Sequence, residues 1–260
     1  MTAIIGMLCS DGVVVGADSS ATFGPHPQIK TIEQPIQKIE IVADKIILTG
    51  TGEVGLGQRF HRIVEQAWAN GIFKNPTGGA KPAMTAIDAG VKLSQAMHES
   101  LQATRVEKNR YGAILAFPCH KKLFLTEFSI ETFQPELKKD PPGLWWTSMG
   151  SGQPITDPFL ALLRESMWPS SQPNVREGTF ATLWALEHAI ACNPGGINGP
   201  ARLAVLQKQP DGDFKARVLE EAELAEHREA MEQAKSGLKA ALNALGKPQG
   251  VQVDLPKVTG

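Results

Sequence analysis

The sequence of 260 residues has few cysteines, a single tyrosine and almost no net charge. Its three cysteines, Cys9, Cys119 and Cys192, are far apart and form no CxxC pair, which argues against a disulfide framework and a thiolate zinc site. The formal net charge is -1, so neither a basic surface for nucleic acid nor an acidic solvating tail is expected. With so few aromatic residues, a platform that stacks bases is not expected either.

Long apolar runs are also missing, and none is sufficient to cross a bilayer. The first residues lack the cationic start and the small-residue cleavage site of a signal peptide. The histidines are scattered, and His98-Glu99 is not followed by the second histidine of a zincin motif. We therefore expect a cytoplasmic protein with no metal, no cofactor, no nucleic-acid partner and no membrane partner.

What the sequence does contain is a regular order of strand and helix patterns. Paired β-branched runs predict hairpins at 2–8 with 13–17 and at 38–42 with 45–49, and 22–34 is expected to be a loop. Then follow helices 54–70 and 84–101, strands 111–117, 122–128 and 144–149, helices 154–167 and 179–192, and strands 202–206 and 214–219. Hairpins with helices grouped in pairs predict an α+β fold. Two antiparallel sheets face to face, each with a helix pair outside, would make a four-layer αββα sandwich.

The C-terminal part has a different character. We divide the chain into a domain at 2–219 and a helical extension at 220–260. Residues 220–245 form a charged amphipathic pattern with Met231, Leu238, Leu242 and Leu245 on one side, and Gly246-Lys247-Pro248 ends it. The apolar side either packs on the helix's own domain or contacts a neighbouring subunit, and the sequence leaves both readings open.

Four positions near the N-terminus suggest chemistry. Removal of Met1, which is efficient before a small residue, would leave Thr2 with a free amine. Asp18 ends an apolar run, where a carboxylate is costly unless it is paired. Lys38 comes directly before a strand, and Gly52 ends the next one, where glycine permits close approach of a substrate. Each position also has an ordinary structural explanation, such as a turn-capping Asp.

Together and in this order, these residues resemble the N-terminal signature of proteasome β subunits. The resemblance runs from Thr2 to about Gly55, and Gly150-Ser151-Gly152 resembles the family's glycine-serine-glycine turn. It implies the fold of the N-terminal-nucleophile (Ntn) hydrolases. It also implies a threonine endopeptidase that cleaves peptides or unfolded proteins within a homo-oligomeric ring, with no indication of an unfoldase partner.

The resemblance assigns catalytic roles residue by residue. Thr2 resembles the nucleophile and its α-amine the base, because a hydroxyl is a poor nucleophile without one. The ordinary pKa of that amine is about 7.7–8.0, and the ammonium of Lys38 would favour its neutral form. Asp18 would orient Lys38, the Gly52 backbone N–H would bind the oxyanion, and Ser151 would form a hydrogen bond near the amine.

Substrate-binding positions follow from the same resemblance. The backbones of Thr22, Gly52 and Val54 would hold the substrate as an added β-strand, and Ala21, Ile36, Gly50 and Val54 would line the main specificity pocket. A glycine at position 50 implies a roomy pocket.

Two departures from the family keep other functions open. Ser20 stands where the family usually has arginine, and Asn193 lies where an acid near the site serine is expected. The alternative is a non-catalytic structural ring subunit. A more remote alternative is a dinucleotide-binding oxidoreductase, since Gly50-x-Gly52-x-x-Gly55 matches that fingerprint formally. The βαβ unit that the fingerprint requires is not predicted here.

Overall fold

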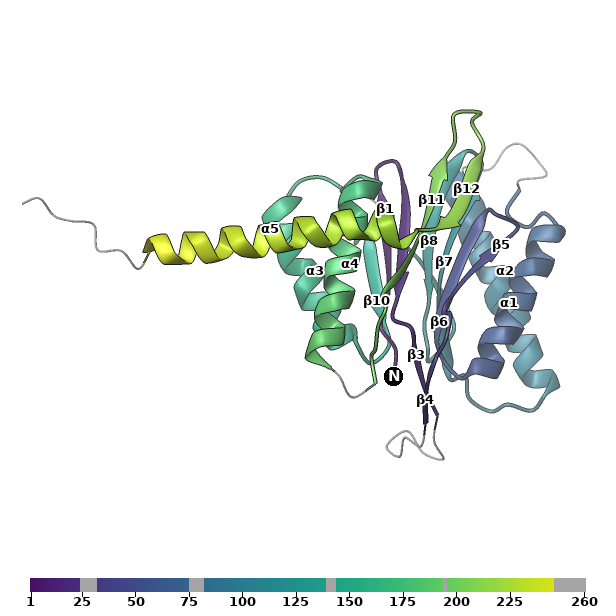
Figure 1. Cartoon of the computed structure of the whole chain (residues 1–260). Coiled ribbons are helices and arrows are strands. Elements are labelled where there is room, and N and C mark those ends of the chain that lie inside the picture. Colours follow the sequence, from purple (N-terminus) through teal and green to yellow (C-terminus); the bar gives the residue numbers. More distant parts are fainter. Residues whose placement is uncertain (24–31, 75–81, 139–143, 194–195, 246–260) are drawn as a thin grey trace, which may run out of the picture.

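The computed structural model describes residues 1–23, 32–74, 82–138, 144–193 and 196–245. Two five-stranded antiparallel sheets lie face to face, and each carries a pair of helices on its outer side (Figure 1). This four-layer αββα sandwich confirms the predicted fold class.

The first sheet has the strand order β10-β1-β2-β11-β12. Its strands are β1 (Ile4–Cys9), β2 (Gly12–Ala17), β10 (Trp146–Met149), β11 (Arg202–Lys208) and β12 (Phe214–Val218), and its outer helices are α3 (Gln153–Met167) and α4 (Val175–Cys192). β1 and β2 are buried almost throughout, because helices cover one face of the sheet and the second sheet covers the other. Helix α4 begins before the predicted start at residue 179, since Asn174 and Glu177 form a capping box there.

The second sheet has the order β5-β6-β7-β8-β9. It contains β5 (Ile39–Val42), β6 (Ile46–Gly52), β7 (Tyr111–Cys119), β8 (Lys122–Phe128) and β9 (Pro135–Leu137), under α1 (Val54–Ala69) and α2 (Pro82–Ala103). Ile4, Val15, Ile47 and Ile114 belong to the apolar layer between the sheets. That layer fixes how the start of β1 faces the end of β6, where the candidate site lies.

One expected loop contains strands instead. Strands β3 (Ser20–Phe23) and β4 (Ile32–Pro35) form a separate two-stranded sheet, and residues 24–31 between them lie outside the described residues. The prediction of a loop was wrong here, because a strand pair held by backbone hydrogen bonds needs no apolar pattern. The Ile36 N–H donates to the Ser19 carbonyl at 3.0 Å, which anchors the chain just before Lys38.

Helix α5 (Glu221–Leu245) starts on the sandwich and extends away from it (Figure 1). Leu224 and Met231 are buried with residues of α4, and the Arg228 guanidinium lies 2.5 Å from the Glu187 carboxylate. Further along, Leu238 and Leu245 are 68% and 83% exposed. The first half of the helix therefore packs on its own chain, whereas its apolar side continues into solvent. None of the described helices is long and apolar enough to cross a bilayer.

Candidate active site

The first hairpin brings Thr2 and Asp18 together. Ile4 pairs with Ala17 across β1 and β2, so the residue before β1 lies beside the residue after β2. The Ala3 N–H donates to the Asp18 carboxylate at 2.8 Å, and the Asp18 N–H donates to the Ala3 carbonyl at 3.0 Å. The turn between β1 and β2 therefore places Thr2, just before β1, close to Asp18, just after β2.

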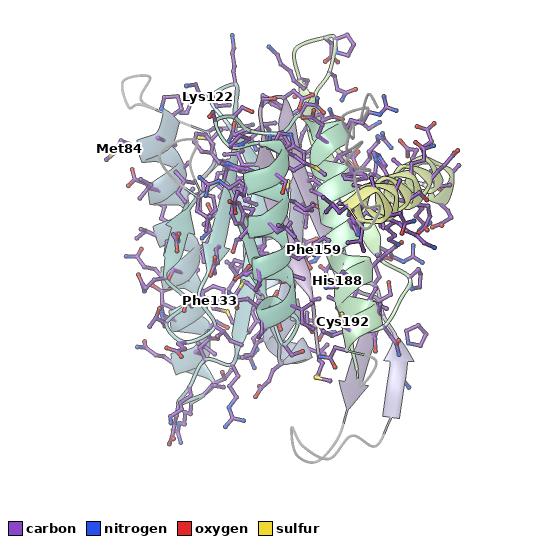
Figure 2. All side chains as sticks on the ribbon, turned by 90° about the vertical axis from the view of Figure 1, so that its left-hand side faces the viewer. Met84, Lys122, Phe133, Phe159, His188 and Cys192 are labelled. Atoms are coloured by element: carbon purple, nitrogen blue, oxygen red, sulfur yellow. The ribbon has the colours of Figure 1, made fainter. Side chains whose placement is uncertain are left out.

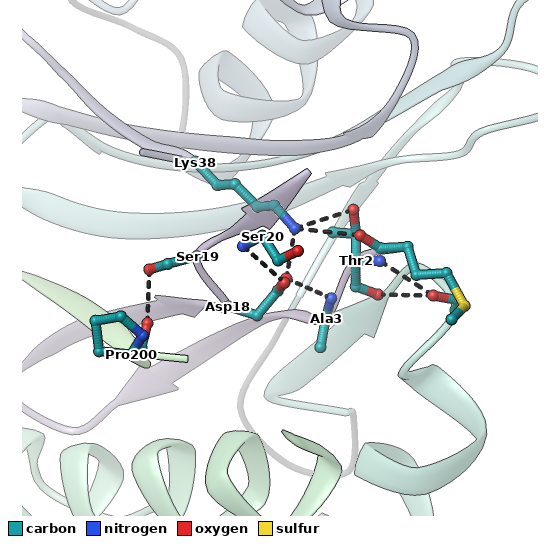
Figure 3. Close-up of polar contacts among 9 residues, drawn as sticks. Thr2, Ala3, Asp18, Ser19, Ser20, Lys38 and Pro200 are labelled. Carbon is teal, nitrogen blue, oxygen red and sulfur yellow. Dashed lines mark hydrogen bonds and ion pairs between the residues drawn. The ribbon is translucent and has the colours of Figure 1, made fainter. Parts of the chain in front are cut away.

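Asp18 and Lys38 form a buried ion pair (Figure 3). The Lys38 ammonium lies 2.6 Å from the Asp18 carboxylate, and the two side chains are 8% and 0% exposed. The carboxylate also accepts from the backbone N–H groups of Ala3 and Ser20. Such complete pairing is what makes two charges tolerable in a site this dry.

The same ammonium reaches the Thr2 side chain. Lys38 Nζ donates to Thr2 Oγ1 at 3.3 Å and to the Met1 carbonyl at 3.3 Å. Because Met1 is attached in this structure, the Thr2 nitrogen is a peptide amide that occupies the place of the free α-amine. That nitrogen lies 3.0 Å from Ser151 Oγ, although the two residues are 149 positions apart.

The glycine-serine-glycine turn surrounds the Thr2 backbone. β10 pairs with β1, so the chain leaves Met149 opposite Ile4 and turns around Thr2 before α3 begins. Gly150 has a φ of +94°, and a Cβ there would lie 2.3 Å from the Thr2 carbonyl oxygen. The Gly152 N–H donates to that same carbonyl at 3.0 Å. Only glycine fits at position 150, which is the physical reason for the motif.

Thr2 opens onto a pocket of about 580 Å³. The wall includes the predicted nucleophile Thr2 and the predicted supporting residue Lys38. It also includes the positions predicted to contact the substrate or its oxyanion, namely Ala21, Ile36, Gly50, Gly52 and Val54. Gly52 has a φ of +115°, and a Cβ there would lie 1.9 Å from the Arg110 carbonyl oxygen, so a side chain is excluded. Thr22 lies in β3, where its backbone pairs with Glu33.

The sequence did not anticipate Tyr111, which also lines the pocket. A Cβ at Gly50 would lie 2.1 Å from the Tyr111 hydroxyl oxygen. The phenol therefore occupies the place that a side chain at position 50 would take, and the pocket beside it still has a volume of about 580 Å³. The signal was not local, because it depends on the pairing of β6 with β7.

Asn193 does not take the place of the missing acid. It caps the C-terminal end of α4, and its N–H donates to the Ala189 carbonyl at 3.0 Å. Within the described residues, Ser151 forms hydrogen bonds only with Thr2, and no carboxylate contacts it. In the same part of the chain, no group of three or more His, Cys, Asp and Glu residues is arranged to hold a metal ion.

The dinucleotide fingerprint lacks its structural setting. Gly50, Gly52 and Gly55 do lie between a strand and a helix, but α1 is followed by α2 and not by a strand. The next strand, β7, runs antiparallel to β6. This connection is not the βαβ unit that places a pyrophosphate at a helix N-terminus.

Comparisons with known proteins agree with this geometry. The family described as "Proteasome subunit" matches residues 2–75. "Proteasome subunit beta" from Methanocaldococcus fervens is 25% identical over 224 residues, which cover 84% of this chain and 87% of that protein. Among solved structures, Anbu (ancestral beta-subunit) from Yersinia bercovieri aligns with a TM-score of 0.64 at 9% identity, over 99% of this chain and 100% of the other. An Anbu (Gly-1) mutant from Hyphomicrobium sp. strain MC1 aligns with 0.63 at 11% identity, over 100% of both chains.

The layered fold is that of the Ntn hydrolases. In sequence, the chain is similar to proteasome β subunits.

Proposed function

We propose that the chain is a threonine endopeptidase in which Thr2, after removal of Met1, attacks the peptide bond of a peptide or unfolded protein. The observation that carries this proposal is the placement of Lys38. Its ammonium is held by the buried Asp18 carboxylate at 2.6 Å and lies 3.3 Å from Thr2 Oγ1. A structural ring subunit without activity has no physical need for a buried ion pair aimed at a hydroxyl.

The residues support a complete cycle. The free α-amine of Thr2 takes the proton from Oγ1, directly or through a water, as Oγ1 attacks the carbonyl carbon. The amine then returns that proton to the leaving nitrogen, and the C–N bond breaks to leave an ester on Thr2. Water, deprotonated by the same amine, hydrolyses the ester and releases the acid. The Gly52 N–H would stabilise the oxyanion in both steps.

In this scheme, Lys38 would control the protonation of the Thr2 amine and Ser151 would control its orientation. An ammonium close to the amine disfavours a second positive charge, so it keeps the amine in its proton-accepting form. Ser151 Oγ lies 3.0 Å from the Thr2 nitrogen and would orient it by a hydrogen bond. With Met1 attached, that nitrogen is an amide with no basic lone pair, so processing is part of the mechanism.

The direct test is hydrolysis of denatured casein by the purified mature chain. We expect soluble peptides to accumulate and a threonine-directed covalent inhibitor to block their release. If an assembled, Met1-free chain cleaves neither casein nor short fluorogenic peptides, the non-catalytic structural subunit becomes the better explanation.

We further propose that the enzyme works as an oligomer of its own chain, joined in part through α5. Leu224, Met231, Leu238 and Leu245 recur every seven residues and therefore share one side of the helix. The first pair is buried on α4, and the second pair continues the same stripe in solvent. An apolar surface on a neighbouring subunit would cover the exposed pair. The chain itself has such a surface.

That surface is the outer side of α3 and α4. Leu162 is 57% exposed on α3, and Phe159 stacks on His188 of α4 with ring centroids 4.6 Å apart (Figure 2). The distal half of α5 from a second copy would cover these side chains. A contact between two different surfaces of the same chain is the type that closes into a ring or extends into a filament.

Charged substitutions in the distal half of α5 should therefore reduce assembly. We expect the Leu238→Glu/Leu242→Glu double variant to elute as smaller species than the wild type in size-exclusion chromatography with light scattering. The single variant Lys239→Glu adds similar negative charge to the same exposed segment and serves as the matched control. If both variants assemble like the wild type, α5 does not join the subunits.

A further inference from the structure

Tyr111 lines the candidate pocket. It is the only tyrosine of the chain, and its ring lies against Phe60 and Phe133 with centroid distances of 6.2 Å to each. Its hydroxyl end lies between two glycines, one on β6 and one on α1. A Cβ at Gly50 or at Gly57 would lie 2.1 or 3.5 Å from the hydroxyl oxygen. Both glycines thus make room for a phenol on the pocket wall.

The polar end of Tyr111 lies at the pocket wall. The residue is 6% exposed, and within the described residues the hydroxyl forms no hydrogen bond. Burial raises the pKa of Tyr111, so the phenol stays protonated and can both donate and accept. A phenol has a polar tip on an apolar body, so it is suited to bind the polar end of a ligand in the pocket.

The charged side chains of the pocket wall are mainly acidic. Among the charged residues that line the pocket in the described part of the chain, Glu40 and Glu53 are carboxylates, and the single cation is Lys38, already paired with Asp18. Glu53 is partly balanced by Arg110 at 3.8 Å.

Glu40, on the pocket wall, contacts a histidine of α1. Its carboxylate contacts His61 Nδ1, and His61 Nε2 lies 3.3 Å from Glu65. Glu65 is also paired with Arg62 at 3.3 Å, so the cluster of these four side chains has one negative charge when His61 is neutral. A carboxylate has two oxygens that each accept hydrogen bonds, so a positively charged ligand group would find a further acceptor at Glu40.

On the basis of the peptidase function proposed above, we propose that this pocket selects substrates with arginine or lysine immediately before the cleaved bond. The aliphatic stem of such a side chain fits against the apolar wall at Ile36 and Val54. Its charged end then lies near Glu40 and donates to the Tyr111 hydroxyl. Tyr111 and Glu40 are thus the specificity-determining residues, and Gly50 and Gly57 are the positions that admit the phenol.

Four fluorogenic tetrapeptides that differ only in their last residue test this on the mature chain: arginine, lysine, glutamine and leucine. We expect kcat/KM for arginine and lysine to exceed that for leucine by about tenfold or more, the size that a charge-assisted hydrogen bond supports. Glu40→Gln should lower the arginine-to-leucine ratio about tenfold, since it removes the charge but keeps the shape. Tyr111→Phe should lower the arginine and glutamine rates relative to leucine.

Glu99→Gln is the matched control, because it makes the same change at an exposed position of α2 away from the pocket wall. Its arginine-to-leucine ratio should equal that of the wild type. A ratio measured within one variant is independent of the amount of folded enzyme, so a structural defect alone does not move it. Equal rates for all four peptides, a preference for leucine, or an unchanged ratio in Glu40→Gln would overturn the inference.

Binding separates this inference from the proposed activity. If no peptide is cleaved, the peptidase proposal fails, and calorimetry of the full-length Thr2→Ala chain with arginine-ended and leucine-ended peptide amides tests the pocket alone. About tenfold tighter binding of the arginine peptide supports the pocket inference. Equal affinities contradict it.

Discussion

The Thr2→Ala substitution is expected to lower kcat/KM for peptide hydrolysis by at least about 10³-fold, the scale seen when a nucleophile is removed. The reason is that Thr2 Oγ1 is the hydroxyl to which the Lys38 ammonium donates at 3.3 Å. The substitution removes that hydroxyl and leaves the Asp18–Lys38 pair in place. Cleavage of a fluorogenic peptide by equal amounts of each assembled protein measures the effect.

Two comparisons make the result interpretable. Thr2→Ser keeps a hydroxyl in the same place and should retain measurable activity, while both variants should elute at the wild-type position in size-exclusion chromatography. Robust cleavage by assembled Thr2→Ala would show that another group attacks the peptide bond.

The second large effect concerns the buried ion pair. Asp18→Asn leaves the Lys38 charge without its partner in a site where the two side chains are 0% and 8% exposed. Removal of one member of a buried pair typically costs about 3–5 kcal/mol of unfolding free energy. We therefore expect denaturation in urea, followed by tryptophan fluorescence, to occur at clearly lower concentration, with activity lost as well.

The double variant Asp18→Asn/Lys38→Met separates stability from catalysis. It contains no unpaired buried charge and fills a similar volume, so most of the lost stability should return. Activity should not return, because the ammonium near the Thr2 amine and hydroxyl is missing. If the double variant regained activity together with stability, Lys38 would have only a structural role.

The sequence predicted the elements whose signals are local. The hairpin around Ser10-Asp11-Gly12 and the periodic helices were recognisable because side-chain period and turn chemistry act over a few residues. The start of α4 was predicted too late, although Asn174 and Glu177 carry a readable capping signal. Strands β3 and β4 were missed because backbone pairing holds them without an apolar pattern.

The features of the candidate site also differ in whether the sequence alone could predict them. Thr2, Asp18 and Lys38 were found through their order in the chain, but the contact of Thr2 with Ser151 requires the pairing of β10 with β1. Tyr111 was missed because its place beside Gly50 follows from the register between β6 and β7 and from α1 above them. Such relations arise only when the layers are assembled, so no local pattern encodes them.

The most direct test of the central claim, that Thr2 with a free amine is the nucleophile, is intact-mass measurement before and after treatment with a threonine-directed covalent inhibitor. We expect the untreated protein to lack Met1, the treated protein to gain one inhibitor per chain at Thr2, and Thr2→Ala to gain none. A chain that retains Met1, or an adduct that persists in Thr2→Ala, would contradict the account.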